Sequence, residues 1–269
     1  MAVSWLILDI GNSAVKWGQF ANGVLRDTGR LELDRSDFAH PAAWQAALKD
    51  VLPDAGVRAG IVSVVPDANA PAQAAVTAST GAPARVLQTE GWLPFTLAYK
   101  TPQTLGTDRL AAAAGAWLDY GMATEANPAR SVLAVDAGTA LTIEVVRHDA
   151  TYLGGVIAPG PRLLRDALAT GGAQLPAIDL NVPAHPTGTS TEHALQSGIM
   201  HGFAGMAEGL VARLEATLPD TPRILLTGGA ASLLQDTLPR IDAHVPHLVL
   251  RGAYRLLVNR MEEDLAQSG

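Results

Sequence analysis

The sequence predicts a mixed α/β fold made of two similar halves. Short runs of β-branched and other apolar residues alternate with long alanine-rich stretches, which is the pattern of strands and helices in one chain. The segment LILDIGNSAVKWG at 6–18 is also echoed by VLAVDAGTALTIE at 132–144. Both contain an apolar strand, an aspartate, any residue, a glycine, a small polar residue and a second strand. We therefore expect an internal duplication in which each half begins with a hairpin.

The first half is predicted to contain several strands and two helices. The apolar runs that predict strands cover residues 3–9, 13–20, 24–32 and 59–65. One helix is predicted over 41–51, because Pro41 is suited to the first helical position. A second is predicted over 108–120, because Gly121 is a helix-ending residue.

The second half restarts with strands and continues with helices. Strands are predicted over 132–136, 140–147 and 152–157, helices over 160–169 and 191–217, and a further buried strand over 223–229, which ends in two glycines. Apolar residues recur at helical spacing along the longer helix, at Phe203, Met206, Leu210, Leu214 and Leu218. The polar segment 121–131 between the halves is typical of a linker, so the expected domains are 1–121 and 132–269.

Composition excludes several classes of function. The 269 residues include 48% hydrophobic residues, enough for a substantial core, and no cysteine, which excludes disulfides, thiolate metal sites and cysteine nucleophiles. A net charge of -7 without a Lys/Arg cluster argues against binding to nucleic acid. The first apolar run is interrupted by Asp9, and no later run is long enough to span a membrane. We expect a cytoplasmic protein with a small-molecule partner.

The two D-x-G turns, at Asp9 and Asp136, are suited to binding a nucleotide. Glycine lets a ligand approach the backbone, and neighbouring N–H groups and hydroxyls can donate to phosphate oxygens. An aspartate beside such donors would repel phosphate, so a cation such as Mg²⁺ is expected between them. Each turn alone could equally be an ordinary hairpin turn. The repetition favours two facing hairpins that form a nucleotide cleft, and it resembles the actin-like ATPase and sugar-kinase superfamily.

The segment Gly106-Thr107-Asp108-Arg109 lies at the start of the second predicted helix. Near a helix N-terminus Asp108 would be stabilised as an anion and could accept a hydrogen bond from a substrate hydroxyl. Arg109 could pair with a substrate carboxylate. Alternatively, Thr107 is an N-cap, Asp108 a favourable first-turn acid and Arg109 a surface residue. The residues alone leave both interpretations open.

The ordered set of motifs resembles the type III pantothenate kinase family over almost the whole chain. The motifs are DIGNS at 9–13, Tyr99 and Pro102 with GTDR at 106–109, DAGTALT at 136–142, GGVIAPG at 154–160, GTSTEHALQSG at 188–198 and LTGG at 226–229. The resemblance implies a duplicated actin-like (ribonuclease H-like) α/β fold with two mixed-sheet halves and flanking helices. It also implies ATP-dependent phosphorylation of pantothenate to 4'-phosphopantothenate, the first step of coenzyme A biosynthesis.

The resemblance further implies roles for individual residues. ATP and its phosphates would be bound by Asp9, Ile10, Gly11, Asn12, Ser13, Ala14, Val15, Lys16 and Thr139. Asp108 would be the catalytic base, and pantothenate would be bound by Tyr99, Gly106, Thr107, Asp108, Arg109 and Thr191. Asp9 would organise Mg²⁺, directly or through water, and Asp136 would ligate a monovalent cation, K⁺ or NH₄⁺.

A homodimer with composite active sites is implied as well, because Thr191 would reach the substrate of the neighbouring subunit. The chain departs from the family pattern at Ser13, where threonine is usual, at Glu144, where many members have aspartate, and at GTST in 188–191. A part for Glu144 in cation binding and the choice between Thr189 and Thr191 stay open. The alternative functions are a non-catalytic ATP-binding accessory factor and a kinase for another small hydroxy compound.

Overall fold

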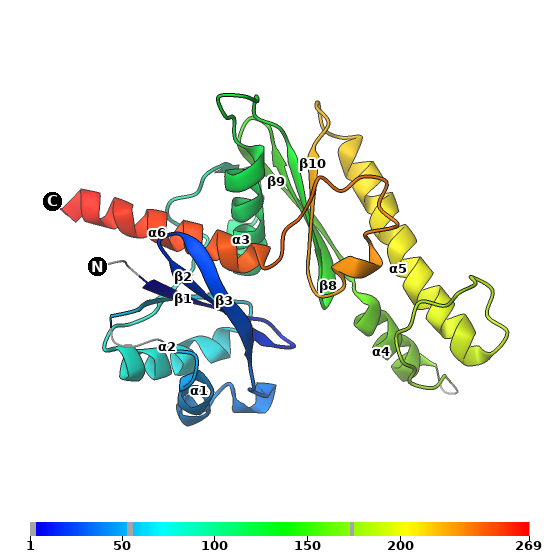
Figure 1. The fold of residues 1–269 in the computed structure, drawn as a ribbon, viewed down its shortest axis with the longest axis horizontal. Coiled ribbons are helices and arrows are strands. Elements are labelled where there is room, and N and C mark those ends of the chain that lie inside the picture. Colours follow the sequence, from blue (N-terminus) through cyan, green and yellow to red (C-terminus); the bar gives the residue numbers. More distant parts are fainter. Residues whose placement is uncertain (1–3, 53–55, 173–174, 269) are drawn as a thin grey trace. The chain divides into compact units, whose positions relative to one another are not determined.

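The chain forms two compact units that are not the two halves of the sequence. Unit 1 comprises Met1–Leu118 and Leu248–Gly269, and unit 2 comprises Asp119–His247. The computed structural model describes residues 4–52, 56–172 and 175–268, and its helices and strands are labelled in Figure 1. Among the described helices, none combines the length and the apolarity that a membrane span requires.

Unit 1 is a mixed sheet with helices packed against it. Its strands are β1 (Ser4–Ile10), β2 (Val15–Ala21), β3 (Val24–Leu31), β4 (Arg58–Ser63) and β5 (Arg85–Val86). They lie in the order β3-β2-β1-β4-β5, with β1 to β3 antiparallel and β4 and β5 parallel to β1. Its helices are α1 (Pro41–Leu48), α2 (Pro66–Thr80), α3 (Thr107–Ala116) and α6 (Leu248–Ser268). Shorter elements are η1 (Arg35–Asp37), η2 (Pro102–Thr104) and β6 (Thr96–Leu97), and a π-helical turn, η3 (Trp117–Gly121), begins in unit 1 and continues into unit 2.

Unit 2 repeats this arrangement. Its strands are β7 (Val132–Ala137), β8 (Ala140–Arg147), β9 (Thr151–Pro159), β10 (Arg223–Thr227) and β11 (Ala243–His244). They lie in the order β11-β10-β7-β8-β9, with β7 to β9 antiparallel and β10 and β11 parallel to β7. The helices are α4 (Pro161–Gly171) and α5 (Thr191–Glu215), with a short turn η4 (Ala231–Leu233). Strand order and direction therefore match between the units, which confirms the predicted duplicated actin-like fold.

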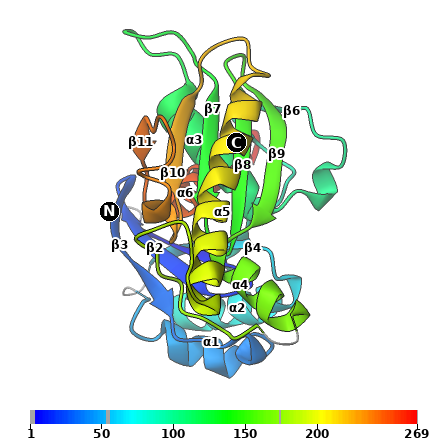
Figure 2. The same ribbon diagram turned by 90° about the vertical axis from the view of Figure 1, so that its right-hand side faces the viewer.

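Each sheet is covered by helices that bury an apolar face. In unit 1, Leu6 and Leu8 of β1 belong to one core cluster with Trp44 of α1 and Val76 of α2. In unit 2, α5 lies along one face of the sheet (Figure 2), where Phe203 packs into the core formed by β7, β8 and β10. Because the first strand of each unit is central and buried, the position where it ends is fixed by the core on both sides.

The predicted elements are largely confirmed, with differences at their ends. The strand predicted over 3–9 is β1, although residue 3 lies outside the described residues, and the helix predicted over 191–217 ends at Glu215. The helix predicted over 108–120 stops at Ala116, where the backbone changes to the π-helical turn. The strand predicted over 152–157 extends to Pro159.

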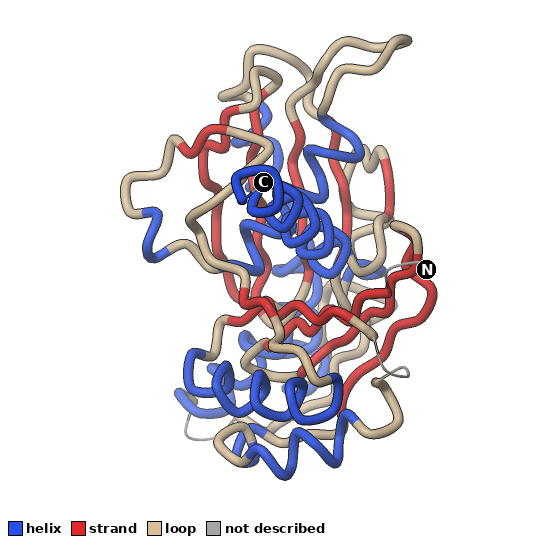
Figure 3. Tube along the Cα trace, turned by 90° about the vertical axis from the view of Figure 1, so that its left-hand side faces the viewer, coloured by secondary structure: helices blue, strands red, loops and turns tan. Residues whose placement is uncertain are grey.

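Helix α6 was not predicted, and it corrects the expected domain 132–269. The helix packs against α3 and β1 of unit 1 and ends near the C mark in Figure 3. Glycines allow the close approach: a Cβ atom at Gly252 would lie 1.8 Å from the carbonyl oxygen of Ala111, and one at Gly60 would lie 2.2 Å from Leu257 Cδ1. The last helix therefore completes unit 1, whereas unit 2 starts at Asp119, just before the predicted linker.

Candidate active site

The first D-x-G turn joins β1 to β2 in unit 1. Asp9 is the next-to-last residue of β1 and is paired in register with Lys16 of β2. Lys16 Nζ lies 3.7 Å from Asp9 Oδ2, and the Asp9 side chain is only 10% exposed. The Gly11 N–H donates to the carbonyl oxygen of Ala14 at 3.1 Å, which closes the turn. A mostly buried carboxylate and an ammonium group thus lie at the base of a turn whose middle is exposed.

The start of α3 is attached to the end of β4 by Thr107. Its Oγ1 donates to the carbonyl oxygen of Ser63 at 3.0 Å and accepts the Ser63 N–H at 3.3 Å. The N-cap residue is Gly106, which provides no side-chain cap, so the interpretation of Thr107 as the N-cap is wrong. Ser63 was not singled out in the sequence, where a small polar residue at a strand end is too common to be informative. The Thr107 hydroxyl is used to position the helix.

Asp108 lies in the first turn of α3. Its Oδ1 accepts the Arg109 N–H at 2.7 Å. Burial raises the pKa of Asp108, although this hydrogen bond and the charges of Arg109 and Lys16 act to lower it. A Cβ atom at Gly106 would lie 2.5 Å from Asp108 Oδ1, so a larger residue at this position would shift the carboxylate. A carboxylate with a raised pKa is a better proton acceptor than an ordinary aspartate, which suits a general base.

Arg109 is buried, with 8% of its surface exposed, so the interpretation of this residue as a surface arginine is wrong. Buried arginines are rare unless their guanidinium groups have partners.

The structure brings Asp9, Lys16 and Asp108 close together, since Lys16 acts electrostatically on both carboxylates.

The second D-x-G turn joins β7 to β8 in unit 2. Asp136 is the next-to-last residue of β7, as Asp9 is of β1, and the Gly138 N–H donates to the carbonyl oxygen of Ala140 at 3.0 Å. Gly228 has a φ of +99°, and a Cβ atom there would lie 2.4 Å from Asp136 Oδ1 and 2.5 Å from the carbonyl oxygen of Ala137. Gly228 of the TGG motif therefore packs closely against the second turn, where a larger residue would clash with the carboxylate and the carbonyl oxygen.

The GGVIAPG motif supports the same turn. The Gly160 N–H donates to the carbonyl oxygen of Thr139 at 3.1 Å. A Cβ atom at Gly160 would lie 2.4 Å from that oxygen, so a larger residue would displace the turn. The side chain of Thr139 is exposed at the tip.

Glu144 is completely buried in β8. Its Oε2 accepts a hydrogen bond from Tyr152 Oη of β9 at 2.6 Å. This contact within the sheet gives the carboxylate a structural partner, so the structure provides no reason to assign Glu144 to a cation site.

The remaining predicted residues lie on other segments. Tyr99 is half-buried after β6, and Thr189 and Thr191 are both exposed. Thr191 is the first residue of α5, whose N-cap Ser190 accepts the N–H of His193 at 3.2 Å. A Cβ atom at Gly188 would lie 2.3 Å from the nitrogen of Ala194, so the GTST segment packs tightly on the first turn of α5.

A separate pocket of about 260 Å³ in unit 1 contains none of the predicted site residues. Its lining includes Trp92, Leu257 and Arg260. In unit 1 the candidate site residues therefore lie on the first turn and at the start of α3, outside this pocket.

Comparisons with known proteins agree with the motif pattern. A family model described as type III pantothenate kinase matches residues 5–213. A protein of Akkermansia muciniphila named type III pantothenate kinase is 39% identical over 170 residues, which is 63% of this chain and 67% of that protein.

Solved structures share the fold over nearly the whole chain. A Campylobacter jejuni protein described as a Baf family transcriptional activator has a TM-score of 0.55 at 18% identity, with 96% of this chain and 99% of that chain covered. The ethanolamine utilization protein EutJ of Carboxydothermus hydrogenoformans has a TM-score of 0.51 at 16% identity, with 94% and 89% covered. At these identities the two structures show the fold alone.

Proposed function

Because the chain belongs to the type III pantothenate kinase family, we propose that its two D-x-G turns and Asp108 carry out the reaction of that family. The protein phosphorylates pantothenate with ATP, the first step of coenzyme A biosynthesis, and uses ATP with a divalent metal. The residues of the candidate site divide among proton transfer, pantothenate binding, phosphate binding and cation binding.

Asp108 is proposed as the general base. Its carboxylate takes the proton of the primary hydroxyl of pantothenate while the hydroxyl oxygen attacks the γ-phosphorus of ATP. The bond from that phosphorus to the bridging oxygen breaks, and ADP leaves. The observation that carries this proposal is the raised pKa of a carboxylate held by the Arg109 N–H at the start of a helix.

Pantothenate is proposed to bind around the same helix. The guanidinium group of Arg109 suits the substrate carboxylate, because its planar fork can donate two parallel hydrogen bonds to the two carboxylate oxygens. Tyr99 and the backbone of Gly106 are proposed to contact the bound pantothenate. Thr107 acts through its contacts to Ser63, which fix the orientation of Asp108.

The 9–16 turn is proposed to bind the phosphates of ATP, and Asp9 to hold Mg²⁺ directly or through water. The residues fit this ion, because the Asp9 side chain is mostly buried and supplies hard oxygen ligands. When bound, Mg²⁺ would neutralise phosphate charge. Lys16 adds a positive charge 3.7 Å from the same carboxylate and suits a phosphate oxygen.

Asp136 is proposed to ligate the monovalent cation, K⁺ or NH₄⁺, and Thr139 to contact ATP. Asp136 Oδ1 and the Ala137 carbonyl oxygen both lie beside Gly228, and oxygen atoms of this kind are the ligands that bind alkali cations in proteins. Such a cation would also reduce repulsion between this acidic turn and ATP.

We also propose a cytoplasmic homodimer in which Thr191 reaches the substrate of the neighbouring subunit. Unit 2 exposes apolar side chains on β9 and α4, namely Leu153, Ile157, Leu163 and Leu168. Exposed apolar patches mark contact surfaces. Thr191 is exposed and so is accessible to a second copy.

The test is product formation with defined cations. The wild type is expected to form 4'-phosphopantothenate from ATP, Mg²⁺ and pantothenate with K⁺ or NH₄⁺ and far less with Na⁺. Loss of one charged ligand in Asp136→Asn should raise the K⁺ concentration needed for half-maximal rate by roughly tenfold or more. The control Asp236→Asn, an exposed aspartate of unit 2, should leave it unchanged. Equal rates in Na⁺ and K⁺, with Asp136→Asn behaving like wild type, would overturn the cation assignment.

A further inference from the structure

Arg35 contacts the phosphate turn from outside it. It is the first residue of η1, which follows β3, and its side chain is exposed. Arg35 Nη1 donates to Asn12 Oδ1 at 2.6 Å and approaches the carbonyl oxygen of Asn12 at 3.4 Å, across 23 positions of sequence. Both contacts are therefore to a single residue in the middle of the 9–16 turn.

The rest of the turn shows why this contact matters. The hydrogen bond from Gly11 to Ala14 closes the turn at its two ends, and the flanking strands are fixed by the core. The residues between them, Asn12 and Ser13, are exposed. An exposed turn that must be ordered when a ligand binds loses conformational entropy at that step, so ordering it beforehand strengthens binding. Arg35 supplies that order to Asn12.

The positive charge of Arg35 also favours ligand binding at this turn. The guanidinium group accompanies Lys16 as a second cation at this turn. Within the described part of unit 1, Arg35 makes no ion pair with a carboxylate, so its charge is not cancelled by direct pairing. A second cation here favours a phosphate-bearing ligand, which is an advantage in a chain of net charge -7.

We propose that Arg35 is a positioning residue for ATP: it holds Asn12 so that the phosphate turn is arranged before the nucleotide binds. The proposal rests on the proposed role of the 9–16 turn in ATP binding. It goes beyond the motif residues, because Arg35 lies outside every motif by which the chain resembles its family.

The experiment compares Arg35→Ala, Arg35→Lys and the control Arg26→Ala, an exposed arginine on β3. Arg35→Ala should raise the KM for ATP about tenfold, with the KM for pantothenate and the Tm unchanged, because a charged hydrogen bond to the turn is lost. Arg35→Lys should recover part of the effect, since lysine keeps the charge and one donor. Arg26→Ala should match the wild type.

A double-mutant cycle tests whether Arg35 acts through Asn12. Asn12→Ala should raise the KM for ATP, and adding Arg35→Ala should then have little further effect, because the coupled contact is already lost. Additive effects, or an unchanged KM for ATP in Arg35→Ala, would overturn the proposal.

Calorimetric binding of Mg·ADP separates this result from failure of the proposed function. If the wild type binds the nucleotide and phosphorylates pantothenate while Arg35→Ala binds equally well, the assignment of Arg35 alone is wrong. If the wild type binds no nucleotide, the proposed role of the turn is wrong, and the assignment of Arg35 is wrong with it.

Discussion

The buried position of Asp108 suits a proton acceptor but lowers the stability of the folded protein at neutral pH. Burial raises its pKa above the ordinary value of 3.8, so the folded state binds more protons than the unfolded chain between the two pKa values. Stability from this group is therefore present below pH 3.8 and is lost as the pH rises through the folded-state pKa. The Arg109 N–H and the charge of Lys16 limit that loss. A proton acceptor is thus retained at a site where a neutral residue would be more stable.

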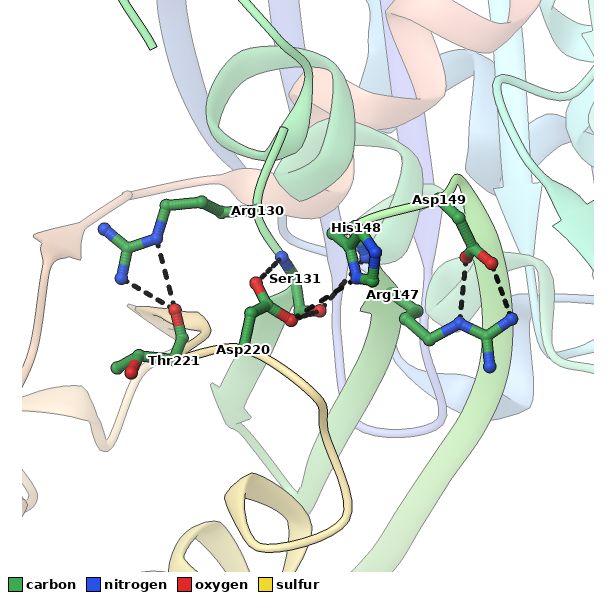
Figure 4. A network of polar contacts seen from close by, with 7 residues as sticks. All are labelled: Arg130, Ser131, Arg147, His148, Asp149, Asp220 and Thr221. Atoms are coloured by element: carbon green, nitrogen blue, oxygen red, sulfur yellow. Dashed lines mark hydrogen bonds and ion pairs between the residues drawn. The ribbon is translucent and has the colours of Figure 1, made fainter. Parts of the chain in front are cut away.

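Ser131 in unit 2 illustrates a polar residue with a purely structural role. Figure 4 shows it between Asp220 and His148. Its N–H and Oγ donate to Asp220 at 2.8 and 2.5 Å, and its Oγ accepts the His148 N–H at 3.0 Å. Burial alone would raise the pKa of Asp220, but the two hydrogen bonds from Ser131, together with the charge of His148 and the backbone N–H of Asp220, lower the pKa below its ordinary value. Ser131 thus ties the start of β7 to the segment before β10.

Replacing Ser131 should destabilise the fold in a pH-dependent way. Ser131→Ala should lower the free energy of unfolding by about 1–2 kcal/mol at pH 7, because a hydrogen bond to a partly exposed carboxylate is lost. A lowered pKa contributes stability above 3.8 that is lost as the pH falls through the folded-state pKa. In urea denaturation, the difference in the free energy of unfolding between the wild type and Ser131→Ala should therefore become smaller below pH 3.8.

The matched control is Asp149→Ala, which removes an exposed ion pair with Arg147. This pair lies at the turn between β8 and β9. It should change the stability little, because exposed ion pairs contribute little. A Ser131→Ala variant as stable as wild type at pH 7 would contradict this interpretation of the network.

The hairpins and the start of α3 could be predicted because their signals are local. A strand that ends next to a D-x-G turn, followed by a second strand after two to four residues, is visible in a short window, and its repetition indicates the duplication. The helix beginning beside Asp108 was likewise marked by the residues around it. The structure adds that Asp9 and Asp136 occupy the same place in two sheets of the same topology.

The remaining features depend on contacts between distant segments, which no local pattern contains. The packing of α6 in unit 1 relies on Gly252 meeting Ala111 and on Gly60 meeting Leu257. Burial of Asp108 and Arg109 likewise results from tertiary packing. The contact of Arg35 with Asn12 spans 23 positions, so it could not be found before the fold was known.

For the whole protein, the proposed homodimer makes a quantitative prediction. If Thr191 serves the neighbouring site, a heterodimer of Thr191→Ala and Asp108→Asn subunits contains one intact site and one doubly altered site. Random mixing makes half of the dimers heterodimers, so the mixture should recover roughly a quarter of wild-type activity. Differently tagged subunits, mixed under exchange conditions, allow the heterodimer to be isolated and assayed.

The same mixture with Thr189→Ala in place of Thr191→Ala decides which threonine makes the contact. Heterodimers that form but show only the summed activity of the two variants would contradict composite sites. A monomer in solution would contradict the dimer itself.

The most direct test of the proposed mechanism is the rate of pantothenate phosphorylation by Asp108→Asn across pH. The matched control is Asp67→Asn, which alters an exposed first-turn acid of α2 in the same unit. Asp108→Asn should lower kcat by roughly 10²–10⁴-fold while Mg·ADP still binds, and Asp67→Asn should match wild type. The kcat/KM of the wild type for pantothenate should fall on the acid side with a midpoint above 3.8, because Asp108 must be ionised to accept a proton. An Asp108→Asn variant within tenfold of the wild-type kcat and with the same acid limb would contradict the assignment of Asp108 as the base.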